Sequence, residues 1–201
     1  MNPSNQLRYS GDAFCHGEQP TDVTAGDFWQ WAFSDLLDNT VRGVLAEFLV
    51  GKALGCTGAY RVNWGASDLT TPAGVRVEVK SAAYRQSWTQ KKPSTIRFSI
   101  RPAHGWNPET LETTPDQRRH ADVYVFCLLE NSEPGPRDPL DLSRWRFFVL
   151  SARVLNHSCP AQKSIGLAPL KLLGPVECGF GELSNVIAEM PFSNPSSPPL
   201  A

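Results

Sequence analysis

The sequence predicts an α/β sandwich, in which helices pack on a central mixed β-sheet. Three observations predict it: one amphipathic helix precedes the strand patterns, two later apolar runs resemble strands buried on both faces, and short helix signals close the chain. The 201 residues are enough for one hydrophobic core and favour a single domain.

The first regular element is expected to be a helix over residues 38–54. Apolar side chains recur at helical spacing from Val41 to Leu49, Asp38 or Asn39 can cap the first turn, and Gly55 can end the helix.

The rest of the core is expected to be mostly strands. Their patterns fall at residues 60–63, 66–71, 75–82, 95–101, 122–129 and 145–150. The last two of these runs are almost wholly apolar, as central strands are. Ser151 and Ser164 can cap short helices, and a terminal helix is expected at 180–190.

The second and third of these strands form a predicted hairpin. A three-residue loop that ends in Gly74 is a favoured solution, with a type I turn followed by a left-handed glycine. This loop pairs Thr71 with Val75 and therefore sets Asp68 across from Glu78, on the same face. A two-residue loop would shift the register and point Asp68 away from Glu78.

The ends of the chain carry weaker patterns. Residues 1–26 show no sustained period and are expected to be a loose lead-in, residues 27–192 form the domain, and residues 193–201 form a disordered tail. The sequence contains no apolar run of about 18 residues and no signal-peptide pattern, so no membrane association is expected. Five scattered cysteines without a CxxC pair fit a cytoplasmic protein.

Charge is unevenly distributed along the chain. The net charge is −1, but residues 69–108 carry seven basic side chains and a single acid. Such a segment can attract a polyanion, or it can be a solvated face without a partner. The candidates for nucleic-acid contact are Arg85, Gln86, Lys91, Lys92 and Arg97.

Three acidic residues and one lysine form the candidate reactive group. Alternation along residues 75–80 places Glu78 and Lys80 on one strand face, and the hairpin adds Asp68. Two carboxylates this close repel unless a cation lies between them, and Mg²⁺ needs only one or two protein carboxylates. Glu47 is the only acid between Asp38 and Asp68, on the helix that precedes the hairpin.

Together, Glu47, Asp68 and the Glu78-Val79-Lys80 tripeptide resemble the PD-(D/E)xK nuclease superfamily over residues 38–82. One departure is Ser67, where the family pattern has proline. The resemblance implies a restriction-endonuclease-like fold and a bound Mg²⁺, for which Mn²⁺ can substitute. It also implies that Asp68, Glu78 and the Val79 carbonyl bind the metal and that Lys80 orients or deprotonates the attacking water. By the same resemblance, Glu47 holds a second metal ion or its water.

These observations predict a Mg²⁺-dependent endonuclease that hydrolyses DNA phosphodiester bonds, of restriction, defence or repair type. RNA as substrate and a homodimer stay open. One alternative is a non-cleaving module of the same fold that binds nucleic acid or a protein partner. Another is a structural protein in which Asp68–Lys80 and Glu78–Arg76 are ordinary surface ion pairs.

Overall fold

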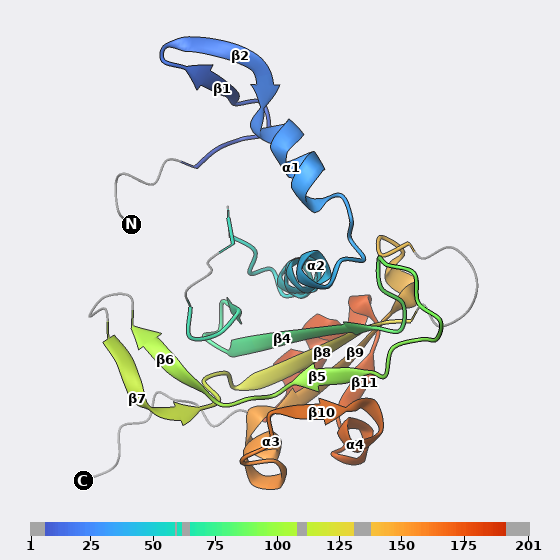
Figure 1. Ribbon diagram of the computed structural model, residues 1–201. Helices are drawn as coiled ribbons and strands as arrows, with labels where there is room; N and C mark the ends of the chain where they lie inside the picture. Colours follow the sequence, from blue (N-terminus) through green and yellow to red (C-terminus); the bar gives the residue numbers. More distant parts are fainter. Residues whose placement is uncertain (1–6, 59, 62–64, 108–111, 131–137, 192–201) are drawn as a thin grey trace.

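The computed structural model describes residues 7–58, 60–61, 65–107, 112–130 and 138–191 (Figure 1). Its centre is a five-stranded sheet in the order β11-β9-β8-β4-β3. The strands are β3 (Leu69–Thr70), β4 (Arg76–Ala83), β8 (Val123–Leu129), β9 (Trp145–Ser151) and β11 (Val176–Cys178). β4 and β8 run parallel and the other neighbouring pairs run antiparallel, so the sheet is mixed, as expected.

Helices cover both faces of this sheet, which confirms the expected α/β arrangement. α2 (Asn39–Ala53) and α5 (Leu183–Glu189) pack on one face. On the other face lie α3 (Ala152–Ser158), α4 (Leu167–Leu172) and the antiparallel pair β5 (Arg97–Ser99) and β10 (Ser164–Gly166) (Figure 1). Every residue of β8 is buried, because both of its faces meet an apolar layer.

The helix expected at 38–54 is α2. The Asp38 carboxylate accepts hydrogen bonds from the backbone N–H groups of Thr40 and Val41, at 2.9 and 3.1 Å. The helix ends at Ala53, and Gly55 takes a left-handed φ of 64° just beyond it.

A buried arginine ties α2 to the end of β4. Arg42 is 1% exposed, and burial lowers the pKa of its guanidinium. The guanidinium donates to the Leu37 carbonyl (3.0 Å), the Gln86 amide oxygen (2.8 Å), the Asn39 amide oxygen (2.7 Å) and the Ser81 hydroxyl (3.2 Å). The bonds to Ser81 and Gln86 link α2 to β4 and to the loop that follows it, and the other two brace the start of α2.

Arg42→Met is therefore expected to lower the free energy of unfolding by about 3 kcal/mol, because several half-buried acceptors lose their donor together. Urea denaturation measures this loss. The matched control is Arg146→Met, since Arg146 pairs with Glu130 at the surface (3.4 Å) and its removal is expected to cost less than about 1 kcal/mol. Equal losses for the two variants would contradict this account of Arg42.

The predicted hairpin register is confirmed. Leu69 pairs with Val77 and Thr70 with Arg76, which is the register that sets Asp68 across from Glu78. The Thr71 N–H donates to the Val75 carbonyl at 2.9 Å, and Gly74 has a φ of 82°. The first strand is shorter than expected, because β3 starts only at Leu69.

Several other elements differ from the prediction. The strand expected at 95–101 is the short β5, which pairs with β10 outside the central sheet. Ser164 lies in β10 and caps no helix; Gly166 precedes α4 instead. Ser151 does cap α3, and its hydroxyl accepts from the Arg153 N–H at 3.3 Å. The expected terminal helix divides into a 3₁₀ turn, η2 (Phe180–Glu182), followed by α5.

Several elements were not expected, among them the edge strand β11. β6 (Ala103–Asn107) and β7 (Glu112–Arg118) form a separate antiparallel ribbon, and η1 (Leu142–Arg144) precedes β9. The expected strand at 60–63 and the tail at 193–201 lie partly or wholly outside the described residues. No helix among the described residues is long and apolar enough to cross a bilayer.

The expectation of a loose lead-in over residues 1–26 was wrong for its described part. β1 (Ala13–His16) and β2 (Gln19–Thr24) form a hairpin, and α1 (Ala25–Phe33) follows directly. The strands are exposed on both faces, so they carry no apolar alternation that a sequence pattern could detect.

Candidate functional site

Asp68, Glu78 and Lys80 meet at the edge of the sheet where β3 joins β4. Alternation along β4 turns Glu78 and Lys80 to the same face. The Lys80 Nζ lies 2.5 Å from Glu78 Oε1 and 4.0 Å from Asp68 Oδ2. The three side chains that the sequence assigned to one site are thus in contact, with one ammonium between two carboxylates.

The backbone of Val79 belongs to the same cluster. Its N–H donates to Asp68 Oδ2 at 2.7 Å. The Asp68 carboxylate thus accepts the hydrogen bond that a backbone carbonyl would accept if β3 were longer. The N–H and C=O of one strand residue point to the same edge. The Val79 carbonyl is therefore directed toward the side of β4 on which Asp68 lies.

The surroundings of Asp68 disfavour its ionised form. Burial and the neighbouring Glu78 carboxylate raise its pKa to about 6, although Lys80 and the Val79 N–H act in the opposite direction. A carboxyl in this state favours either a proton or an additional cation.

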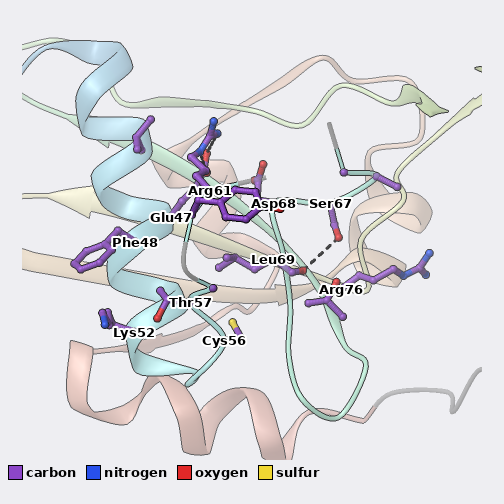
Figure 2. Close-up of a pocket in the computed structure, with 16 residues that line it drawn as sticks. Glu47, Phe48, Lys52, Cys56, Thr57, Arg61, Ser67, Asp68, Leu69 and Arg76 are labelled. Atoms are coloured by element: carbon purple, nitrogen blue, oxygen red, sulfur yellow. Dashed lines mark hydrogen bonds and ion pairs between the residues drawn. The ribbon is translucent and has the colours of Figure 1, made fainter. Parts of the chain in front are cut away.

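Glu47 lies on α2 close enough to Asp68 to add to that repulsion. Its carboxylate, however, is held by Arg61 in a two-bonded ion pair, in which Arg61 Nη2 lies 2.7 Å from Glu47 Oε1. The hydrogen bonds to Glu47 raise the pKa of Arg61, and the charge of Asp68 contributes to that shift. Figure 2 shows Arg61 beside both carboxylates.

Sequence reasoning did not identify Arg61 as a site residue. It comes from the segment after α2, and its partner Glu47 lies fourteen positions earlier. No helical or strand spacing connects two residues across such a segment, so only the fold could show this pair.

The oxygen donors fit a divalent metal of the Mg²⁺ type through two carboxylates. Asp68 and Glu78 provide them, and the Val79 carbonyl provides a third oxygen at the same edge. Within the described residues, no group of three or more His, Cys, Asp or Glu side chains is placed to hold a metal ion. Glu47 pairs with Arg61 and is not grouped with Asp68 and Glu78 as a third metal ligand.

A pocket of about 690 Å³ opens beside this cluster, between α2 and residues 56–70 (Figure 2). Glu47, Arg61 and Asp68 lie on its wall, and Phe48 and Val44 of α2 form an apolar side. The pocket thus leads from solvent to the carboxylate of Asp68.

Arg76 also lines this pocket, but it is not a partner of Glu78. Its guanidinium bonds Asp122 at 2.7 and 3.1 Å, which also raises the pKa of Arg76 and lowers that of Asp122. The Glu78–Arg76 surface pair considered from the sequence is therefore absent, and Lys80 is the cation on Glu78.

The residues expected to contact nucleic acid have different environments. Lys91 and Lys92 are exposed in the loop that continues from β4, and Arg97 is exposed on β5, where it bonds the Ser164 hydroxyl at 2.9 Å. Arg85 is half-buried near the Gln90 carbonyl. Gln86 is buried in the network of Arg42, which does not fit the expected contact with a phosphate.

The chain is similar to a known protein family and to a solved structure. The family model of bacteriophage T4 endonuclease IV matches residues 30–167, a range that contains Glu47, Asp68, Glu78 and Lys80. A solved bacterial homing endonuclease is similar at 18% identity, with 64% of this chain and 76% of that chain covered and a TM-score of 0.36. No curated protein matches the sequence.

Proposed function

The chain belongs to the bacteriophage T4 endonuclease IV family, and from this membership we propose that it hydrolyses DNA phosphodiester bonds in a Mg²⁺-dependent reaction at Asp68, Glu78 and Lys80. The observation that carries the proposal is the contact of these three side chains at the β3–β4 edge, inside the region that the family model matches. We also propose that the site is of the PD-(D/E)xK type.

The chemistry follows from the donors in place. Asp68, Glu78 and the Val79 carbonyl would hold Mg²⁺, with Mn²⁺ as a substitute, and the bound ion would relieve charge on the phosphate and acidify water. With a metal on the two carboxylates, the Lys80 ammonium would no longer be needed to neutralise them. It would then be free to contact the non-bridging phosphate oxygens or, as the neutral amine after giving its proton to solvent, to accept a proton from the attacking water.

Glu47 has a separate role in this proposal. Arg61 bonds both oxygens of the Glu47 carboxylate, so a metal ion at Glu47 would have to compete with Arg61 for them. Arg61 pairs with Glu47, and the charge of Asp68 also acts on it, so an approaching phosphate would be a third anion for this guanidinium. Substrate binding would then free Glu47 for a second metal ion or its water.

A second candidate function is a non-cleaving module that binds nucleic acid or a protein partner. The observation in its favour is that each of the three acids already has a cation, Arg61 on Glu47 and Lys80 on the other two. Titration with Mn²⁺ separates the two functions, because a cluster satisfied by its own cations would not bind the metal.

We place the enzyme in the cytoplasm, among restriction, defence or repair nucleases, with DNA as its partner. The five cysteines are free thiols, which fits a reducing compartment.

The test is incubation of the purified chain with plasmid, linear duplex, single-stranded DNA and RNA in the presence of Mg²⁺. Cleavage of at least one DNA form supports the proposal. Cleavage of RNA alone would replace the substrate class, and no cleavage together with measurable DNA binding would favour the non-cleaving module.

The exposed lysines beyond β4 provide a further prediction. If Lys91 and Lys92 contact phosphates, the affinity for duplex DNA should fall as the salt concentration rises. In the double variant Lys91→Ala/Lys92→Ala, the slope of log affinity against log salt concentration should then be smaller by about 0.9 for each phosphate that is no longer neutralised. Fluorescence anisotropy over a salt series measures the slope. Lys163→Ala, an exposed lysine on another part of the chain, is the control. An unchanged slope in the double variant would place the phosphate contacts elsewhere.

A further inference from the structure

The N-terminal arm, residues 7–33, presents an apolar surface that no other described part of the chain covers. α1 is a well-formed helix, since the hydroxyl of Thr24 and the carboxylate of Asp27 form a capping box at its start. None of its nine residues is buried. Its exposed aromatic residues are Phe28, Trp29, Trp31 and Phe33, and Trp31 is 85% exposed. An uncovered aromatic helix of this kind marks an interaction surface.

The base of the arm is anchored to its own domain at Leu37. Leu37 packs against the core, and its carbonyl accepts from the buried Arg42 at 3.0 Å. The Asp35 carboxylate accepts from the N–H groups of Leu37 and Asp38 at 3.1 and 3.2 Å. This hydrogen-bonded linker holds α1 away from the sheet, as Figure 1 shows.

The same chain carries a complementary surface on the outer side of α2. Val44, Phe48 and Lys52 follow one another at four-residue spacing and therefore share one helix face. Val44 and Phe48 are exposed, Phe48 by 51%, and the Lys52 Nζ lies 5.4 Å from the centre of the Phe48 ring. We call this face the α2 stripe.

Charge favours the α2 stripe over a second arm as the surface on which the arm packs. The arm carries four acids, Asp12, Glu18, Asp22 and Asp27, against Arg8 alone. Two arms would repel each other, whereas the α2 stripe combines apolar side chains with the positive charge of Lys52.

We propose that the arm of one copy packs α1 on the α2 stripe of a second copy of this chain. The contact is reciprocal, because each copy provides one arm and one stripe. Two copies therefore form a closed twofold dimer in which no arm or stripe is left to bind a third copy. Val44 and Phe48 also line the pocket beside Asp68. The arm of the partner therefore covers the α2 side of that pocket. This inference rests on exposed surfaces and does not depend on the proposed activity.

Light scattering on the full chain, at protein concentrations from about 1 to 100 μM, tests the proposal. The wild type is expected to reach twice the monomer mass, and Trp31→Glu is expected to stay monomeric with an unchanged circular dichroism spectrum. The control is Leu172→Glu, since Leu172 is 88% exposed on α4, away from both surfaces. A monomeric wild type, or a dimeric Trp31→Glu, would overturn the proposal.

A mixing experiment identifies the receiving surface. Phe48→Glu alone is expected to be monomeric, because its stripe is altered while its arm is intact. Mixed with Trp31→Glu, it can still form one arm-to-stripe contact, so the mixture should recover part of the dimer mass. A dimeric Phe48→Glu, or a mixture that stays monomeric, would exclude the α2 stripe as the docking site.

Discussion

Lys80→Ala is expected to slow DNA cleavage by about 10³-fold while leaving the fold intact, because an acid–base group at the reacting centre is typically worth 10²–10⁴-fold. Lys80 lies on the polar face of β4, opposite the apolar layer of Val77 and Val79, so its removal opens no cavity. The two carboxylates lose their shared cation, for which we expect a loss of about 1 kcal/mol of stability. Single-turnover cleavage and urea denaturation measure the two effects.

The matched control is Lys171→Ala. Lys171 also pairs with a glutamate, Glu177, at 3.2 Å, but on the surface near α4. This variant should cleave at the wild-type rate. If Lys80→Ala also cleaved at that rate, β4 would not carry the active site.

The second large effect is expected for Asp68→Asn, which should abolish Mn²⁺ binding and cleavage yet stabilise the metal-free protein by about 1 kcal/mol at pH 7. The raised pKa of Asp68, about 6, means that the folded state binds this proton more tightly than the unfolded state does. The ionised carboxylate therefore costs folding free energy. The asparagine oxygen can still accept from the Val79 N–H and is no longer repelled by Glu78.

The sign of the pH dependence follows from that shift. The stability difference between Asp68→Asn and wild type should be largest above pH 6 and should shrink as the pH falls toward 4, where the wild-type carboxyl is protonated. Over the same range protons compete with Mn²⁺ in the wild type, so its affinity should fall below pH 6. Glu177→Gln is the control, and unchanged Mn²⁺ affinity in Asp68→Asn would remove Asp68 from the metal site.

The parts of the site that could be predicted depend on local geometry. The length of the 72–74 loop and the left-handed Gly74 determine the hairpin register, and the register determines which residue faces Glu78. The period of α2 and the apolar runs of β8 and β9 likewise follow from short-range patterns.

The parts that could not be predicted depend on contacts between distant segments. Arg61 neutralises Glu47 across a segment with no regular spacing, and Arg42 draws Gln86 into the interior from a loop that follows β4. The strands of the N-terminal arm show no apolar alternation because none of the described residues covers either of their faces. In each case the decisive partner is far away in sequence or absent from the described residues.

Cleavage by this chain is expected to require a divalent metal ion. Plasmid DNA is incubated with the wild-type chain in Mg²⁺, in EDTA, and in EDTA followed by excess Mg²⁺, and the cleaved fraction is measured over time. We predict cleavage in Mg²⁺, none in EDTA, and full recovery when Mg²⁺ is restored. Cleavage that continues unchanged in EDTA would contradict a metal-dependent site at Asp68 and Glu78.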